Sequence, residues 1–526
     1  MIEDSVSAGS LLRALAPELL LAAGAMVMLL ATVWRPQGNV AGVAEGAERT
    51  SVLARFGMVL CLLVALVVTI AWGNGVSGTV DERIAGDGFR WAIDLVVLLG
   101  TALSLALLDV EHQRSGAYSP EVPVLMLLST LGMLVLAAAR DLMFVFLGIE
   151  LMSLAVYVLA GVNRRSARGA ESAIKYFLLG GFSTGFLLYG IALLYGATGS
   201  TRLVDIAAWA TSHPQLSAMF VVGLALLLVG FAFKVAAAPF HIWTPDVYDG
   251  APLPIAAFMS AGVKTAAFAT FLRVMLEAMP SAAARWHPVL WWLAALTMIV
   301  GNVLALSQRN LVRLLAYSSI AHAGYLLVTI VVNSGAGSAA LVFYTVSYTL
   351  ATMGAFAVLI VVNDGRDRAP TLDDLAGLWA DRPGLAIPMA IYFLSFLGMP
   401  VVGGMGFFAK WYILQAALKA SAPQTVLAII LVLTSAVSAA YYLSVVSTMF
   451  MRARGDARAV SRGSPLARSV IAVTAIALLV LGVYPTPVIR LARLATVQLS
   501  APATPAQVTR PLPMSTVSLD RAHHVN

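Results

Sequence analysis

Four lysines lie inside long apolar stretches of the chain: Lys175, Lys234, Lys264 and Lys410. Of the 33 basic residues, 28 are arginines, and most of these fall between the apolar stretches. A GC-rich coding bias could produce that ratio, so the position of the lysines matters more than their scarcity. A lysine can lose its proton when it is desolvated, whereas an arginine stays charged. The lysines within apolar sequence are therefore candidates for groups that load and release protons.

Two other titratable residues lie in similar surroundings. Glu150 stands in "DLMFVFLGIELMSLAVYVLAG", and His322 stands in "YSSIAHAGYLLVTIVV". A charge at the centre of a bilayer costs about 3 kcal/mol on insertion scales. Glu150 and Lys234 could offset that cost by pairing, either as part of a proton path or as a static ion pair that holds two helices together. A lone histidine is also often a hydrogen-bonded structural residue, but a series of titratable groups at mid-membrane depth is typical of a proton relay.

Helix breakers accompany two of the lysines. Pro239 follows Lys234 by five residues, and the stretch before the lysine of "GMPVVGGMGFFAKWYIL" carries Pro400, Gly403 and Gly404. In lipid, a broken helix is tolerated where its freed backbone groups meet protein or water. The breaks therefore predict small hydrated cavities beside the lysines, with a simple proline kink as the alternative. Lys175 is less distinctive, because Glu171 stands four residues before it and could form a surface pair with it.

The composition defines the class of protein to which these residues belong. The chain is 60% hydrophobic and 11% charged, with a mean hydropathy of +0.88. A soluble protein of this size could not cover so much apolar surface, so we expect an all-α polytopic membrane protein. Its apolar runs are long and continuous, which favours helices over a barrel. Fourteen transmembrane helices are expected near 12–34, 52–72, 91–109, 121–139, 141–162, 173–197, 216–240, 252–278, 288–307, 311–333, 338–362, 384–418, 424–450 and 468–490.

Basic residues in the connecting loops predict the orientation. The loops that follow odd-numbered spans hold most of the arginines: Arg35, Arg49, Arg114, Arg164, Arg165, Arg168, Arg309, Arg313, Arg366, Arg368, Arg382, Arg452, Arg454, Arg458, Arg462 and Arg468. The opposite loops are poor in basic residues, with Arg83, Arg90, Arg140, Arg202, Arg285 and Lys419. The odd loops are therefore expected in the cytoplasm and both termini outside. The polar, Pro-rich tail over 496–526 is expected to be disordered.

The sequence lacks the residues and motifs that several kinds of chemistry require. The single cysteine, Cys61, excludes an internal disulfide and a cysteine-ligated metal or iron–sulfur site within this chain. No dinucleotide, P-loop or hydrolase motif occurs. The acidic N-terminus and the long first apolar run predict a retained span and not a cleaved signal peptide. No cofactor or metal is expected in this chain.

Three stretches carry a resemblance to a known family. "ESAIKYFLLGGFSTGFLLYGIALLYGATGS", "FKVAAAPFHIWTPDVYDGAPLPIAAFMSAGVKTAAF" and "QRNLVRLLAYSSIAHAGYLL" resemble the antiporter-like subunits of proton-pumping NADH-quinone oxidoreductase, complex I. The form "HIWTPDVYDGAP" is most like the branch that includes mitochondrial NADH dehydrogenase subunit 2. The short tail and Lys410 agree with this branch, because the largest sibling has a long lateral helix and the sibling called subunit M has a glutamate at the twelfth-span site.

The resemblance implies an organisation and a set of roles. It implies three N-terminal helices (1–115), two inverted five-helix repeats (116–280 and 281–455), with helices 7 and 12 broken, a last helix (456–495) and the tail. It also implies a proton path through Glu150, Lys234, Lys264 and Lys410, with His322 and Lys175 as contributors. NADH, FMN, iron–sulfur clusters and quinone would be bound by other subunits. The expected partners are subunit M and the small subunits J and K, in a bacterial plasma membrane, with no nucleic acid.

Two other functions agree with the same sequence. One is a subunit of a multisubunit cation/proton antiporter, which uses the same fold without an electron donor. The other is a structural membrane-arm subunit, in which the buried charges only hold helices together. Neighbouring genes for flavin and iron–sulfur subunits would distinguish the first, and a neutral side chain at Lys234 that leaves pumping untouched would favour the second.

Overall fold

The computed structural model describes residues 12–33, 42–73, 83–115, 118–163, 166–366, 368–453 and 463–500. Within these ranges the chain is helical, and its extended contacts are isolated bridges such as the one between Asp141 and Arg202. Twelve of the described helices are long and apolar enough to cross a membrane. The all-α polytopic membrane fold that the composition predicts is therefore confirmed.

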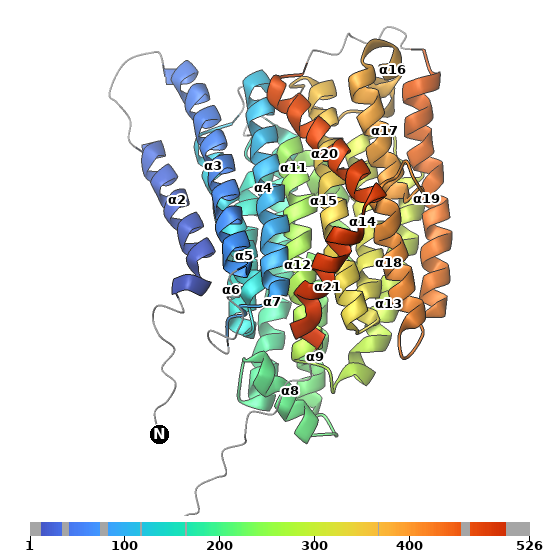
Figure 1. Cartoon of the computed structure of the whole chain (residues 1–526). Coiled ribbons are helices and arrows are strands. Elements are labelled where there is room, and N and C mark those ends of the chain that lie inside the picture. The colour runs from blue at the N-terminus through green and yellow to red at the C-terminus, as the bar shows by residue number, and fades with distance from the viewer. Residues whose placement is uncertain are drawn as a thin grey trace, which may run out of the picture.

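The helices stand roughly side by side, with the chain running from α2 and α3 at one edge to α19 at the other (Figure 1). The first half comprises α2 (Ala16–Val33), α3 (Gly42–Gly73), α4 (Gly88–Ser115), α5 (Glu121–Ala138), α6 (Leu142–Ala160), α7 (Ala167–Thr198), α8 (Leu203–Ser212), α9 (Ala218–Lys234), α10 (Trp243–Gly250), α11 (Leu253–Phe258), the π-helix η1 (Met259–Val263) and α12 (Lys264–Glu277). The second half comprises α13 (Ala283–Ala305), α14 (Leu311–Val331), α15 (Gly335–Asn363), the 3₁₀-helix η2 (Leu372–Leu375), α16 (Leu378–Asp381), α17 (Pro383–Leu397), α18 (Met405–Lys419), α19 (Thr425–Met451), α20 (Pro465–Val483) and α21 (Thr486–Ser500).

The expected breaks in helices 7 and 12 are present. The seventh expected span, 216–240, is interrupted after α9, and α10 follows just beyond its expected end. The twelfth, 384–418, is divided into α17 and α18. The last part of the chain differs from expectation, because residues 496–500 continue α21 instead of starting a disordered tail. The rest of that tail, 501–526, lies outside the described residues, as do Arg35, Arg164, Arg165, Arg454, Arg458 and Arg462.

Local sequence explains where the first broken helix stops. Helix α9 ends at Lys234, and Ala236 then has a φ of 60°, which a right-handed helix cannot accommodate. Pro239 lies in the segment before α10 and has no amide hydrogen to continue a helical ladder. The break thus places Lys234 at the end of a half-helix, where the carbonyl oxygen of Phe233 accepts a hydrogen bond from the indole nitrogen of Trp243 at 3.2 Å.

The second break depends on several glycines. Helix α17 ends before Gly398, which has a φ of 78°, and Gly404, with a φ of 53°, precedes α18. Pro400 and Gly403 lie between them. A glycine adopts these left-handed conformations at little cost, whereas a residue with a side chain is strained there. The glycines therefore permit the chain to leave one helix and start another within the same span, and Val401 between them also has a positive φ, of 66°.

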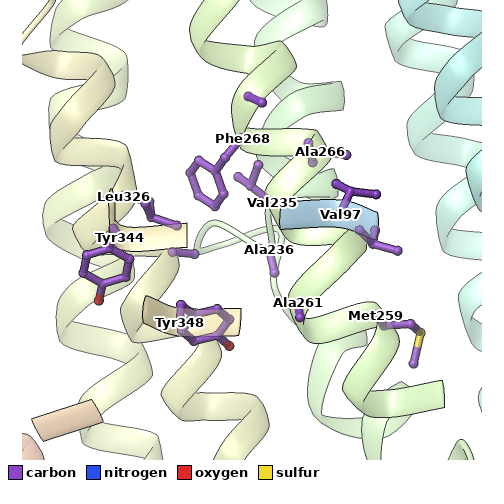
Figure 2. Packing of buried hydrophobic residues seen from close by; sticks show 14 of the residues in the cluster. Val97, Val235, Ala236, Met259, Ala261, Ala266, Phe268, Leu326, Tyr344 and Tyr348 are labelled. Carbon is purple, nitrogen blue, oxygen red and sulfur yellow. The ribbon is translucent and has the colours of Figure 1, made fainter. Parts of the chain in front are cut away.

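The most buried helices are α4, α12, α14 and α15, and they surround the first break. Figure 2 shows Val235 and Ala236 of the segment after α9, with Val97 of α4, Phe268 of α12 and Tyr344 and Tyr348 of α15 in the same region. By contrast, α2 and α3 expose most of their large apolar side chains. The apolar core is thus positioned where the seventh span is interrupted, and the first two helices present apolar surface to lipid or to a partner.

Candidate proton-transfer site

Lys234 is held by a hydroxyl group and not by a carboxylate. Its Nζ donates a hydrogen bond to Ser153 Oγ of α6 at 2.7 Å, and it lies 5.8 Å from the centre of the Tyr157 ring. Tyr157 packs against Gly180 of α7, where a side chain would collide with the tyrosine hydroxyl. The lysine is therefore enclosed between α6 and α7 at the end of the half-helix α9.

The expected direct pair between Glu150 and Lys234 is not formed. Within the described residues, no ion pair joins these two side chains, although the charge of Glu150 still acts on Lys234. The reason is helical geometry: Ser153 follows Glu150 by three residues on the same face of α6, and it takes the position next to the ammonium group. Glu150 is half-buried, so it is left less enclosed than the lysine.

Lys264 begins α12, directly after the π-helix η1. Its Nζ donates to the carbonyl oxygen of Ser319 at 2.6 Å and to the hydroxyl of Ser319 at 3.0 Å. Ser319 belongs to α14, so this contact ties the two helices together inside the core. A short π-helical segment within an α-helix often occurs at a functional site, because it leaves backbone groups without regular partners. On that segment, Ser260 Oγ is 2.8 Å from the hydroxyl of Tyr348.

His322 lies one helical turn beyond Ser319 on α14 and has two tyrosine partners. Its Nδ1 is hydrogen-bonded to the hydroxyl of Tyr344, and its Nε2 lies 3.2 Å from the hydroxyl of Tyr442. Tyr442 in turn lies 2.5 Å from the hydroxyl of Ser318. Because each partner is a hydroxyl group, it can donate to or accept from the ring, and the contacts fit either tautomer.

Lys410 lies on α18, after the second break. Its Nζ donates to Ser435 Oγ of α19 at 2.6 Å and to the carbonyl oxygen of Leu397 at 2.8 Å. That carbonyl ends α17, so it is one of the groups that the helix break frees from helical bonding. The ammonium also lies 4.9 Å from the centre of the Tyr325 ring, which offers a cation–π contact.

A small cavity connects His322 with Lys410. It has a volume of about 10 Å³, roughly the room that one water molecule requires. Its polar lining consists of His322, Tyr344, Ser347, Tyr348, Ser395 and Lys410. The charges of both Lys264 and Lys410 act on His322, which agrees with a place between the two lysines. The cavity lies at the second break, where the sequence predicts a hydrated space.

Lys175 lies apart from the buried lysines and from His322. Its Nζ pairs with Glu171 at 2.6 Å, as the spacing of the two residues allows, and with Asp246 of α10 at 2.9 Å. Asp246 also pairs with Arg313 of α14 at 2.8 Å. The Lys175 side chain is 42% exposed, so it belongs to a partly solvated ion network at the first turn of α10 and not to the buried groups.

The structure thus brings four of the six predicted site residues into buried hydrogen-bonded positions. Lys234, Lys264, His322 and Lys410 are each less than a tenth exposed, and each contacts at least one hydroxyl group. Isolated charges in such an environment are costly unless they are hydrogen-bonded. The predicted helix breaks, Pro239, Pro400, Gly403 and Gly404, all lie within the two interruptions beside Lys234 and Lys410.

The hydroxyl partners were missed by the sequence analysis. Ser153, Ser319 and Ser435 receive the three buried lysines, and Tyr344 and Tyr442 receive the histidine. A serine is common in apolar helices, so its type alone carries little signal. The short run "YSSIAHAGY" contained a usable signal, because helical spacing places its hydroxyl groups on the same side as the histidine.

Within the part of the chain that is described, no group of three or more His, Cys, Asp or Glu side chains gathers. The single cysteine, Cys61, is buried in α3. The polar groups gathered around the two helix breaks are lysines, a histidine and hydroxyls, all of which can exchange protons. The arrangement is chemically suited to moving protons between neighbouring groups.

Comparison with known proteins identifies a family with the same architecture. A family model described as "NADH:quinone oxidoreductase/Mrp antiporter, TM" matches residues 139–438. NADH-quinone oxidoreductase subunit N of Gemmatimonas aurantiaca is 69% identical over 518 residues, which cover 98% of this chain and 100% of that protein. The subunit of the same name from Trichlorobacter lovleyi is 43% identical and covers 84% and 88% of the two chains.

Solved structures agree with this similarity. A chain of respiratory complex I from Thermus thermophilus with bound aureothin superposes with a TM-score of 0.75 at 36% identity, covering 91% of this chain and 99% of that one. A chain of the Mrp complex from Dietzia gives a TM-score of 0.79 at 19% identity, covering 94% and 98%. At that identity the second likeness concerns the fold alone.

Proposed function

This chain belongs to the NADH-quinone oxidoreductase subunit N family and is a proton-translocating membrane-arm subunit, and from that premise we propose which of its residues carry the proton. The path consists of Lys234, Lys264, His322 and Lys410, with Glu150 as the charge that controls Lys234. Lys175 acts at the edge of the path, through the ion network around Asp246.

The observation that supports this path is the nature of the lysine partners. Each buried lysine donates to a serine hydroxyl, with Nζ–Oγ distances of 2.7, 3.0 and 2.6 Å for Lys234, Lys264 and Lys410. A hydroxyl can accept a hydrogen bond from an ammonium group and can donate one to a neutral amine. The contact therefore remains possible in both protonation states, whereas a carboxylate partner would strongly favour the charged one.

The proton moves in this proposal from the first break to the second. Lys234 loads a proton while the nearby charge of Glu150 favours the ammonium form. A signal from a neighbouring subunit weakens that influence, and the proton passes to Lys264. Ser319 and His322 on α14 lead from Lys264 to the cavity that Lys410 lines. Transfer beyond Lys410 to the outer side completes the passage.

The aromatic groups of α10 bridge the space between Lys234 and Lys264. Trp243 stacks on Tyr176 at 4.6 Å between ring centres, beside Tyr157 and Lys234. Tyr248, one helical turn and a half further along α10, lies near the hydroxyls of Ser260 and Ser319. The hydroxyl of Tyr248, or a water molecule beside it, would complete the connection to Lys264.

The driving reaction belongs to the rest of the complex. The chain acts as a non-redox subunit of a proton-translocating oxidoreductase, while NADH, FMN, the iron–sulfur clusters and quinone are bound by other subunits. Subunit M and the small subunits J and K are the proposed partners, and the apolar surfaces of α2 and α3 are the proposed contacts. The chain lies in a bacterial plasma membrane with both termini outside. Its two broken helices belong to two inverted repeats, over 116–280 and 281–455. The helices over 1–115 precede these repeats, and the helix over 456–495 follows them.

The test is the Lys234→Ala variant in the assembled complex, with Lys419→Ala as the matched control. Lys419 is exposed at the end of α18 and takes no part in the path. NADH-driven quinone reduction and proton uptake are measured in membrane vesicles after normal assembly has been verified. The proposal expects both activities to fall for Lys234→Ala and to persist for Lys419→Ala. Wild-type activities in both variants would mean that the buried lysine has only a structural role.

A further inference from the structure

A buried carboxyl group on α4 lies outside the proposed path. Asp94 has no exposed surface, and neither of its carboxyl oxygens has a hydrogen-bond partner in the structure. It lies in the second turn of α4, at the end of the bundle where that helix begins. A buried polar group without a partner is rare, because losing its hydrogen bonds to water is costly. This group therefore requires an explanation.

Among the described residues, the cation that contacts Asp94 is Arg90, and the charge of this guanidinium is already matched by another group. The NH2 nitrogen of Arg90 donates to Glu18 Oε1 at 2.5 Å and to the carbonyl oxygen of Ala14 at 2.8 Å. Its NH1 nitrogen donates to the carbonyl oxygen of Ala85 at 2.7 Å. Only Nε of Arg90 faces Asp94, at 3.5 Å from Oδ2 and without hydrogen-bond geometry. Two acidic groups thus compete for one guanidinium, and Glu18 has the closer contact.

The surrounding charges add no further compensation for Asp94. Asp87 accepts a hydrogen bond from the backbone amide of Arg90 at 2.8 Å, and its carboxylate is paired with Arg273 through two bonds of 2.7 and 2.9 Å. Arg273 also pairs with Glu277 at 2.7 Å. The charged groups that act on Asp94 are Arg90, Glu18 and Asp87, so one positive and two negative charges face it.

We propose that Asp94 is a proton-binding site: its carboxyl group is protonated in this conformation and ionises when Arg90 Nε moves within hydrogen-bond distance. In the step itself, the O–H bond of the acid breaks, the proton leaves to water, and the carboxylate gains a charge-assisted bond from Nε. The group then takes up a proton again when Arg90 withdraws. Protonation removes the cost of an unpaired buried charge from a group whose two oxygens receive no hydrogen bond.

This proposal does not depend on the lysine path. It concerns a resting protonation state at the end of the bundle where α4, α2 and α12 meet, and it can be measured without turnover. A matched control stands on the same helix: Asp109 is also fully buried, but its Oδ2 accepts from Arg55 at 2.9 Å and from Gln113 at 3.1 Å. Asp109 therefore has the hydrogen-bond donors that Asp94 lacks.

The experiment is infrared difference spectroscopy on the assembled complex in lipid, with wild type compared with Asp94→Asn and with Asp109→Asn. The variant-minus-wild-type spectrum of Asp94→Asn is expected to show loss of the carbonyl stretch of one protonated carboxylic acid. The Asp109→Asn spectrum is expected to show loss of a carboxylate band and none of the acid band. Loss of a carboxylate band in Asp94→Asn would overturn the proposal.

A second variant covers the case in which asparagine prevents assembly. Asp94→Glu keeps the acid but changes its environment, so the acid band should shift in frequency and not disappear. An acid region identical to wild type would overturn the proposal. Thermal stability gives an independent readout, because replacing a neutral acid with asparagine leaves the local charge unchanged. A large loss of stability in Asp94→Asn, similar to that in Asp109→Asn, would indicate an ionised Asp94 and overturn it as well.

Discussion

The hydroxyl of Ser153 should matter to function as much as the lysine that it holds. It is the hydrogen-bond partner of Lys234 Nζ at 2.7 Å, and it also donates to the carbonyl oxygen of Ile149. Ser153→Ala removes the acceptor and leaves a buried ammonium group without its partner. A hydrogen bond to a charged group contributes about 1.5–3 kcal/mol. Since 1.4 kcal/mol corresponds to tenfold, the whole contact corresponds to about 10- to 150-fold. Proton binding by Lys234 should weaken by less than that, because the neutral amine also loses its contact with the hydroxyl.

The assay measures NADH-driven quinone reduction together with proton uptake into vesicles, at equal amounts of assembled complex. Both should fall at least several-fold in Ser153→Ala and recover in Ser153→Thr, which restores a hydroxyl. Ser129→Ala is the matched control, because Ser129 is a buried serine of α5 that donates to a helix carbonyl, that of Met152, at 3.0 Å and touches no lysine. Equal activities in Ser153→Ala and Ser129→Ala would refute the role assigned to the hydroxyl.

Two other predictions concern the second break and a connecting loop. Gly406→Ala should prevent normal assembly, because the added carbon would lie 2.0 Å from the carbonyl oxygen of Ser395. Native gels would show the loss of the assembled complex. Gly185→Ala, where the added carbon faces open space, should assemble, and normal assembly of both variants would contradict the prediction. Burial alone would raise the pKa of Asp374, but hydrogen bonds from Arg368 and from a threonine lower it to about 2. Because the pKa of Asp374 is lower in the folded loop than in the unfolded one, its ionised form stabilises the folded loop above about pH 4, and this stabilisation is lost as the pH falls towards 2. The stabilisation amounts to about 1–2 kcal/mol after allowance for the exposed arginine. Hydrogen exchange of the loop, corrected for intrinsic rates, should show a larger loss in wild type than in Arg368→Gln, where the bonds from Thr371 remain. Equal pH dependence in both would count against the ion pair.

The fold was largely accessible from sequence because the bilayer imposes strong constraints. Apolar runs of about 20 residues must be helices, since their backbone groups have no other way to be satisfied in lipid. Pro239 and the glycines around Pro400 predicted the two breaks, because such residues interrupt the helix that the bilayer otherwise requires. The helix over 486–500 was missed because it is amphipathic and follows the last apolar run, where the polar sequence after Arg493 resembled a disordered tail.

The titratable residues of the site were also accessible, but their partners were not. Lysine and histidine in apolar sequence stand out by their cost, whereas serine and tyrosine do not. The direct pair between Glu150 and Lys234 was expected because opposite charges on neighbouring helices attract. The outcome depended on the rotation of α6, which places Ser153 at the lysine, and that rotation is determined by packing against α5 and α7. No pattern within a single span contains this information.

The three buried lysines share one structural arrangement, although they come from different helices. Each stands beside an irregular helix segment: Lys234 at the end of α9, Lys264 directly after the π-helix, and Lys410 after the break that follows α17. Irregular segments free backbone carbonyl groups, and Lys410 uses such a carbonyl, that of Leu397. A serine hydroxyl from a neighbouring regular helix completes each site. A lysine in a regular helix surrounded by apolar side chains would have neither group and would remain neutral. The irregular segment and the hydroxyl together permit the charged state without fixing it, and this is what a residue that both accepts and releases a proton requires.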